Sequence, residues 1–206
     1  MKLGPKYKIC KRLGAGVFEK CQTQKFALSE ARNPRIKKSG GMRGGGSNFG
    51  VQLLEKQKAR FTYGISERQF FRYVKEAMER KGSDSSRDLV SRLEARLDNV
   101  AYRAGYAATR RQARQLAAHG HLTINGRRVT TPSYKVEKGD VVAIREGSRT
   151  SPFFATVAEK ALERVLPNWL KQNEADVYSV IATASPELAQ TELQFDPAVI
   201  IQFYSR

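Results

Sequence analysis

The 206-residue sequence has no run of about eighteen apolar residues, so it predicts no membrane-spanning helix. Its opening, MKLGPKYKICKR, is basic but lacks an apolar stretch, so we do not expect it to act as a secretory signal. Two cysteines are present, Cys10 and Cys21. They could form one disulfide, but nothing indicates secretion, so reduced thiols are the expected state. The sequence is therefore typical of neither a membrane protein nor a secreted one.

Acidic residues are also scarce, and positive charge is in excess. Against 20 acids stand 37 lysines and arginines, which gives a net charge of +17. The excess is +10 in residues 1–46, +4 in 47–105 and +6 in 106–150, whereas residues 151–206 carry −3. A chain this basic binds polyanions, because phosphates relieve its self-repulsion and release counterions. The acidic C-terminal part indicates that one end faces nucleic acid and the other faces solvent or a protein.

Residues 1–46 show almost no apolar period and include the glycine run GGMRGGG at 40–46. Glycine and lysine bury too little surface to offset the entropy of ordering, so we expect an extension that orders on its target. The glycine run lacks the G-K-[ST] ending and the preceding strand of a phosphate-binding loop, so a flexible linker is the favoured interpretation. With 40% hydrophobic residues, most of the remaining chain can build a core.

Helical patterns follow the extension. In the clearest one, residues 66–82, Ser66 and Gln69 form a predicted capping box. Apolar residues keep a helical spacing from Leu89 to Ala104, which predicts a helix there. A further short helix is expected after Thr109, which is placed to cap it, and before Gly120.

A period of two residues then replaces the helical period. Asn125-Gly126 is the strongest short signal for a hairpin, because both turn positions need positive φ. Gly139-Asp140 and the following VVAIR predict another turn and strand. Ser151 and Pro152 begin a further helix, and VYSVIATA at 177–184 is a strand candidate.

Arginines gather around the short helix and the hairpin. Arg110 and Arg114 are four residues apart and share a helix face, and Arg127 and Arg128 follow the hairpin turn. A helix N-terminus, a row of arginines and an adjacent hairpin make a surface for phosphates. Charge runs are usually solvated faces, but few acids interrupt this one.

The stretch from Arg96 to Val142 resembles the α-L RNA-binding motif shared by several RNA-handling families. The segments VQLLEKQKARFTYGISERQFFRYVKEA, RLEARLDNVAYRAGYAATRRQARQLAAHGHLTINGRRV, PSYKVEKGDVV and the final FYSR resemble the bacterial type of the S-four family of small-subunit ribosomal proteins. The resemblance runs in order over most of residues 49–149 and returns at the C-terminus.

The resemblance implies an α+β fold in three parts: a basic extension over 1–46, a helical domain over 47–95 completed by the peptide 190–206, and an α-L domain with a small antiparallel sheet over 96–189. It also implies a structural constituent of the small ribosomal subunit in the cytoplasm. Such a protein is a primary binder of the 5′ domain of small-subunit rRNA and nucleates assembly. It contacts ribosomal proteins S-five and S-three, and acts in mRNA entry and translational accuracy.

Basic residues on these elements are the candidate rRNA contacts. They are Lys6, Lys8, Lys11, Arg12, Lys56, Lys58, Arg60, Arg68, Arg72, Arg103, Arg110, Arg111, Arg114, His119, Arg127 and Arg128. A second set, in the glycine-rich part of the extension, is the candidate for mRNA near its entry channel: Arg35, Lys37, Lys38 and Arg43. Flexible cations of this kind can follow the phosphates of a single strand, although contact with fixed rRNA is the competing interpretation.

The extension departs from the family pattern where many relatives carry four zinc-binding cysteines. Cys10 and Cys21 are remnants of that site, whereas Tyr7 and Phe26 stand at the other two ligand positions. Structural zinc needs four Cys or His ligands. We therefore expect no metal and no other cofactor, and expect Tyr7 and Phe26 to fill the space with apolar contact.

An enzyme is the main competing class, because RNA-modifying enzymes can carry an α-L motif and a catalytic aspartate within R-L-D. Here Arg96-Leu97-Asp98 lies inside the α-L pattern, and its residues are interpreted as helix-surface residues. No Ser or Cys nucleophile pattern surrounds His119 and His121, and residues 151–206 are too few for a catalytic domain. A free-standing RNA-binding regulator would lack the helical block 47–95. The favoured prediction is a non-enzymatic rRNA-binding protein.

Overall fold

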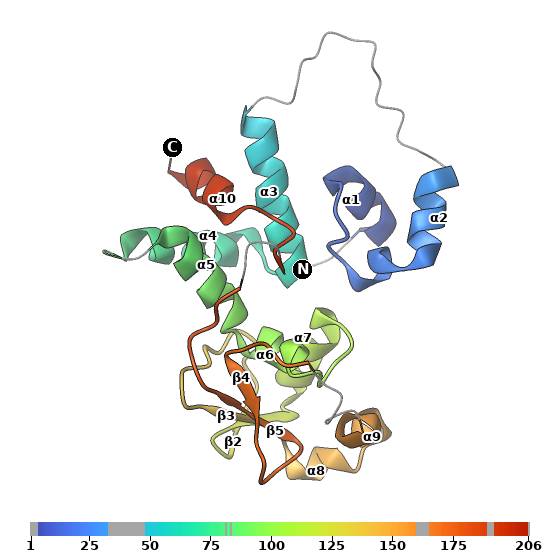
Figure 1. The fold of residues 1–206 in the computed structure, drawn as a ribbon, viewed down its shortest axis with the longest axis vertical. Coiled ribbons are helices and arrows are strands. Elements are labelled where there is room, and N and C mark those ends of the chain that lie inside the picture. Colours follow the sequence, from blue (N-terminus) through green and yellow to red (C-terminus); the bar gives the residue numbers. More distant parts are fainter. Residues whose placement is uncertain are drawn as a thin grey trace. The chain divides into compact units, whose positions relative to one another are not determined.

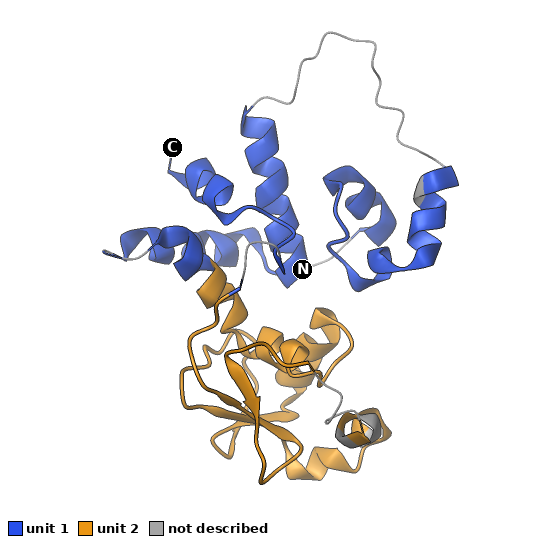
Figure 2. Ribbon diagram, in the orientation of Figure 1, with its two compact units in different colours: residues 1–89, 188–206 blue, residues 90–187 orange. Residues whose placement is uncertain are grey.

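A computed structural model describes residues 4–32, 48–80, 82, 84–159, 165–188 and 192–205. The chain divides into two compact units, of which one comprises residues 1–89 with 188–206 and the other residues 90–187 (Figure 2). The first division falls within a helix, a few residues before the expected boundary at 95–96. Among the described residues, no helix is long and apolar enough to cross a membrane.

The described part of the N-terminal extension has its own secondary structure and belongs to the first unit. It contains helix α1 (Lys6–Leu13), the 3-10 helix η1 (Glu19–Gln22) and helix α2 (Gln24–Arg32) (Figure 1). Their apolar side chains form a buried cluster that Phe61 of helix α3 completes. The expectation that the extension has too little apolar surface to fold is therefore wrong for residues 4–32. Its apolar and aromatic residues are spaced irregularly in the sequence but pack into one cluster. That the N-terminal extension becomes ordered on binding RNA stays a prediction.

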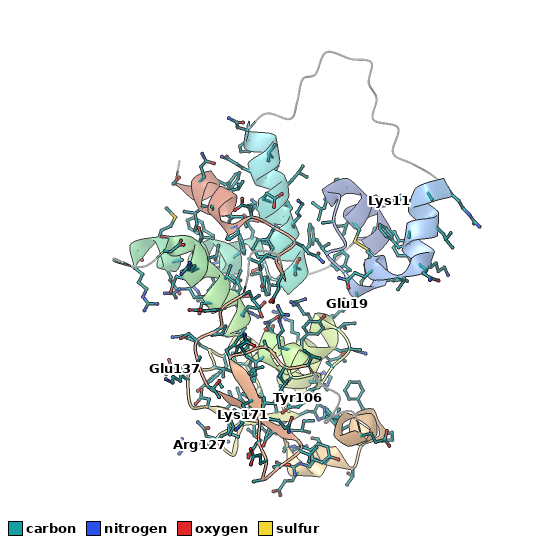
Figure 3. All side chains as sticks on the ribbon, in the orientation of Figure 1. Lys11, Glu19, Tyr106, Arg127, Glu137 and Lys171 are labelled. Carbon is teal, nitrogen blue, oxygen red and sulfur yellow. A yellow bond between two sulfur atoms is a disulfide. The ribbon has the colours of Figure 1, made fainter. Side chains whose placement is uncertain are left out.

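Cys10 and Cys21 form a disulfide in this cluster (Figure 3). The expectation of reduced thiols is thus wrong for the structure, because α1 and η1 pack so that the two Cα atoms lie 6.6 Å apart. Both cysteines are buried. Tyr7 and Phe26 do meet as expected, with their ring centroids 5.2 Å apart.

The rest of the first unit includes three complete helices among the described residues: α3 (Asn48–Tyr63), α4 (Glu67–Glu79) and α10 (Pro197–Tyr204). Ser66 caps α4 as predicted and accepts a hydrogen bond from the backbone N–H of Gln69. The Gln69 side chain donates to the Tyr73 hydroxyl. The last helix, α10, begins at the cap Asp196 and packs against α3 and α4.

The helical pattern from Leu89 to Ala104 is interrupted at Arg96. Helix α5 (Ser85–Glu94) ends before it, and helix α6 (Leu97–Arg103) begins after it. Arg96 is extended and pairs with Lys135 in an isolated β-bridge. The backbone N–H of Leu97 donates to the carbonyl of Tyr134, so a strand-like segment distant in sequence replaces helical hydrogen bonds. The apolar spacing alone does not reveal this break.

The second unit contains a five-stranded antiparallel sheet, which confirms the α+β prediction. Its strands lie in the order β2-β1-β3-β5-β4. Their bounds are β1 (Leu122–Ile124), β2 (Arg127–Val129), β3 (Val141–Ile144), β4 (Leu170–Gln172) and β5 (Ser179–Ala182). Helix α7 (Arg110–His119) packs against α6, and helices α8 (Glu146–Arg149) and α9 (Pro152–Glu159) follow β3.

The core of this unit joins the sheet to helices α6 and α7. Leu97, Val100 and Leu122 have no exposed surface in it. Tyr106, which follows α6, donates its hydroxyl to the carbonyls of Val142 on β3 and of Tyr178, the residue directly before β5. A buried phenol with such partners fixes the loop before α7 onto the sheet.

Candidate RNA-binding surface

Helix α7 begins and ends at the two cap residues that the sequence predicts, Thr109 and Gly120. The Thr109 side chain accepts from the backbone N–H of Gln112 at 3.2 Å, and Gly120 ends the helix with a left-handed φ of 73°. Ala113, Leu116 and Ala117 are buried. The opposite side of the helix leaves Arg111 exposed.

The hairpin between β1 and β2 places two arginines at the edge of the sheet. Asn125 and Gly126 have φ values of 49° and 80°, which confirms the predicted turn. Arg127, which Figure 3 labels, and Arg128 follow it on β2. Both are exposed. Arg128 also donates to the carbonyls of His119 and Gly120, at the C-terminal end of α7. A cation is favourable there because it compensates the helix dipole.

Buried acids lie beneath the arginines of α6 and α7. Glu94 has no exposed surface. Its carboxylate accepts from Arg103, with Nε 2.8 Å from Oε2, and from the Asn99 amide at 2.7 Å. Asn99 Oδ1 in turn accepts from Arg110 Nε at 2.8 Å. The Arg110 guanidinium lies 4.4 Å from the ring centroid of Tyr102.

The R-L-D triplet also belongs to this buried layer. Arg96 and Asp98 are 2% and 4% exposed, and their side chains form an ion pair at 2.6 Å. Arg114 Nη1 lies 3.9 Å from Asp98. The interpretation of Arg96 and Asp98 as helix-surface residues is therefore wrong, because the break before α6 turns both side chains inward.

The electrostatics around the hairpin and α8 are consistent with an excess of cations. Burial lowers the pKa of His121, and nearby His119, Arg145 and Arg128 lower it further. His121 Nδ1 lies 3.0 Å from Ser148 Oγ. At neutral pH this histidine is therefore neutral and takes part in packing, whereas His119 is exposed.

The candidate contacts in the first unit fall into two groups. Lys56 is buried and pairs with Glu67 at 2.8 Å, Arg60 pairs with the same carboxylate at 2.6 Å, and Lys58 pairs with Glu55. Lys6 and Lys11 are partly buried, and Lys11 donates to the carbonyl of Ser29. The exposed candidates of this unit are Lys8, Arg12, Arg68 and Arg72.

The four candidates for mRNA contact, Arg35, Lys37, Lys38 and Arg43, lie outside the described residues. Within the ranges that the structure describes, no three His, Cys, Asp or Glu side chains form a metal-binding cluster. Glu94, Asp98 and Asn99 were not predicted from the sequence as parts of the site. The available signal was two acids within the apolar spacing of 89–104, close to Arg96 and Arg103.

Comparison with known protein families identifies the class of protein to which the chain belongs. Residues 95–142, which include α6, α7 and the hairpin, match the S4 domain, and residues 2–94 match the ribosomal protein S4/S9 N-terminal domain. Three similar proteins are each named small ribosomal subunit protein uS4. The one from Roseiflexus castenholzii is 41% identical over 206 residues, covering 99% of this chain and 98% of that protein.

The second, from Pelotomaculum thermopropionicum, is 42% identical over 202 residues, covering 97% of this chain and 96% of that protein. The third, from Corynebacterium kroppenstedtii, is 47% identical over 160 residues, covering 78% and 79%. The chain belongs to the family of small ribosomal subunit protein uS4, which confirms the resemblance found in the sequence. This family consists of structural proteins of the ribosome, not enzymes.

Proposed function

We propose that this chain is a structural constituent of the small ribosomal subunit and binds the 5′ domain of small-subunit rRNA through the face formed by α6, α7 and the β1–β2 hairpin. One observation carries the proposal: arginines of α7 and of the hairpin share the edge of one compact unit, where Arg128 joins the end of α7 to β2. Cations held on rigid elements fix the register of a protein on the phosphate backbone.

The proposed contacts differ in what they can contribute. Arg111 and Arg127 are exposed, so they can neutralise phosphates directly. In the first unit, Lys8, Arg12, Arg68 and Arg72 are exposed in the same way. Lys56, Lys58 and Arg60 form ion pairs within the first unit, and these pairs would compete with the rRNA contacts predicted for them.

The test is binding of the purified full chain to the isolated 5′ domain of small-subunit rRNA, with an unrelated RNA of equal length as the control. If about six to ten phosphates are neutralised, affinity should fall roughly a thousand-fold or more between about 50 and 200 mM salt. We expect a preference for the 5′ domain at every salt concentration. Equal affinity for the two RNAs throughout the series would contradict the proposal.

The finer assignments belong to the same proposal. The chain would be a primary binder that nucleates assembly in the cytoplasm, contacting ribosomal proteins S-five and S-three and affecting translational accuracy. Arg35, Lys37, Lys38 and Arg43 would line the path of entering mRNA, supported by four cations within nine residues of the sequence. Such cations lower the cost of holding separated strands, because they screen phosphates without reading bases.

The mRNA assignment is tested by replacing these four residues with alanine and reconstituting ribosomes. If subunits assemble normally but translate structured messages more slowly than unstructured ones, the assignment holds. If assembly fails, or if the relative rates on both messages are unchanged, the four cations contact fixed rRNA instead and the assignment is wrong.

A further inference from the structure

The arginines of the proposed RNA-binding face differ in how firmly they are held. Within the described ranges, Arg111 and Arg127 are exposed and form no ion pair with an acid. In contrast, Arg103 and Arg110 have side chains that are 24% and 20% exposed, and both lie against the buried Glu94. The face thus combines exposed cations with cations that a buried acid holds from below.

Glu94 holds Arg103 along one side of its guanidinium. Nε of Arg103 donates to one carboxylate oxygen at 2.8 Å, and Nη2 donates to the other at 3.2 Å. Such two-point pairing fixes the plane of the guanidinium as well as its position. Because Glu94 is fully buried, it cannot exchange this partner for water without a large cost.

Glu94 also fixes Arg110, which is the first residue of α7. Asn99 donates its amide to Glu94 and accepts from Arg110 Nε, while Arg110 Nη2 lies 3.9 Å from Glu94 Oε1. One face of the Arg110 guanidinium is covered by Tyr102. With one edge bonded and one face covered, the plane of the Arg110 guanidinium is fixed.

Asp98, on α6, is a second buried acid beneath an arginine, Arg114, which lies one turn further along α7 than Arg110. It is buried, pairs with Arg96 through two contacts of 2.6 and 3.0 Å, and lies 3.9 Å from Arg114. Arg110 and Arg114 are four residues apart on one face of α7, so each of them approaches one buried acid. The two acids together lie beneath a row of guanidinium groups.

We propose that Glu94 and Asp98 are positioning residues for RNA recognition, which hold Arg103, Arg110 and Arg114 so that this face selects a folded RNA over other polyanions. This inference rests on the proposed function. Guanidinium groups oriented before binding lose less entropy when they meet phosphates in the matching arrangement. The buried negative charges also reduce the attraction of this face for any polyanion, and so reduce sequence-independent binding.

The test is Glu94→Gln in the full chain, which keeps the shape of the side chain but removes its charge. Affinity is measured for the 5′ domain of small-subunit rRNA and for an unrelated duplex RNA of equal length, over a series of salt concentrations. We expect affinity for the 5′ domain to fall about ten-fold, and affinity for the duplex to stay constant or rise, because cations lose orientation but not charge. A parallel loss for both RNAs is the result of a merely structural role and overturns the proposal.

A matched pair of conservative variants tests the same idea if Glu94→Gln fails to fold, as judged by circular dichroism. Arg110→Lys keeps the charge but loses the planar fork, and Arg111→Lys makes the same change at the neighbouring exposed arginine. We expect Arg110→Lys to lose affinity for the 5′ domain alone, and Arg111→Lys to lose little for either RNA. Equal effects of the two variants overturn the proposal.

The outcomes for the unmodified chain separate this inference from the proposed function. If the unmodified chain does not prefer the 5′ domain over the duplex, the proposed function fails, and the positioning role fails with it. If the preference exists and survives both Glu94→Gln and Arg110→Lys, the positioning role alone is overturned.

Discussion

The phenol of Tyr204 donates a 2.6 Å hydrogen bond to the carboxylate of Glu67, which joins the last helix of the chain to α4. Lys56 and Arg60 approach the same carboxylate from α3. Burial raises the pKa of Tyr204 well above its usual value, and the hydrogen bond to Glu67 raises it further, so the phenol stays protonated as a donor. One carboxylate thus connects three helices of the first unit.

Tyr204→Phe should destabilise the first unit by about 1–3 kcal/mol, because the partly buried Glu67 loses a donor while its other partners remain. The free energy of unfolding, obtained from a urea titration, measures the effect. Hydrogen exchange in α10 and α3 then shows whether the loss falls in these helices. Tyr134→Phe is the control, because Tyr134 is 41% exposed in the second unit. Equal stability of Tyr204→Phe and the unmodified chain would contradict this prediction.

The stability of the first unit should also depend on the charge of Glu67. Burial raises the pKa of Glu67, but hydrogen bonds from Lys56, Tyr204 and Arg60 outweigh it and lower the pKa below 4.5. The ionised form is therefore favoured in the folded state, and its contribution to stability is fully present above pH 4.5. That contribution is lost as the pH falls through the folded-state pKa.

We expect Glu67→Gln to lower stability at pH 7 and to weaken its dependence on pH below about 4.5, since no carboxylate then titrates at this position. Unfolding midpoints measured from pH 7 to pH 3 check this. Glu79→Gln, on the exposed C-terminal end of the same helix, is the matched control and should keep the slope of the unmodified chain. A Glu67→Gln variant with that same slope would overturn the assignment.

Local signals in the sequence predicted those parts of the fold that are set by neighbouring residues. Ser66 and Thr109 cap their helices, and Asn125 and Gly126 form the hairpin turn, because each depends on backbone groups within three residues. The exposed arginines of α7 and the hairpin were predictable in the same way. The resemblance to the α-L motif then led to the proposal that they lie on an RNA-binding face.

Interactions between distant residues could not be predicted by the same reasoning. The break at Arg96 depends on Lys135 and Tyr134, and the buried cluster of the N-terminal part depends on Phe61 of α3. Each of these residues looks unremarkable in its own sequence window. Glu94 likewise matches a helical pattern, and its role appears when Arg103 and Asn99 converge on it.

The disulfide should stabilise the N-terminal part of the first unit. Replacing Cys10 and Cys21 by serine removes a cross-link over a sequence separation of 11 residues, for which chain entropy gives about 3 kcal/mol. We expect faster hydrogen exchange in α1 and η1, with exchange in the second unit unchanged as the internal control. Treatment of the unmodified chain with a reductant should reproduce the effect. Unchanged exchange in α1 after both treatments would contradict this prediction.

The same cluster predicts that the chain binds no stoichiometric zinc. Cys10 and Cys21 bond to each other, and Tyr7 and Phe26 occupy the remaining ligand positions with a ring contact. Elemental analysis of untagged protein, prepared with and without a reductant, measures the zinc content. A content of one ion per chain that is lost on Cys10→Ser would show the prediction to be wrong.

Charge reversal on the proposed RNA-binding face should weaken RNA binding far more than the same change at exposed lysines elsewhere in the second unit. Arg111 on α7 and Arg127 and Arg128 on the edge strand β2 are exposed. They are the residues to change because Arg110 and Arg114 approach buried acids. The matched control reverses Lys135, Lys138 and Lys171, which are exposed too, with Lys171 on the opposite edge strand β4 (Figure 3). Both triple variants change the net charge of the chain by the same amount.

Reversal of Arg111, Arg127 and Arg128 to glutamate should lower affinity for the 5′ domain by about a hundred-fold or more at moderate salt and reduce the salt slope by about three, because three phosphate contacts are lost. The lysine triple variant should keep the slope of the unmodified chain and lose little affinity. Fluorescence anisotropy over a salt series gives both quantities. If the two triple variants lose affinity equally, net charge alone governs binding, and the face of α7 and the hairpin is not the RNA-binding surface.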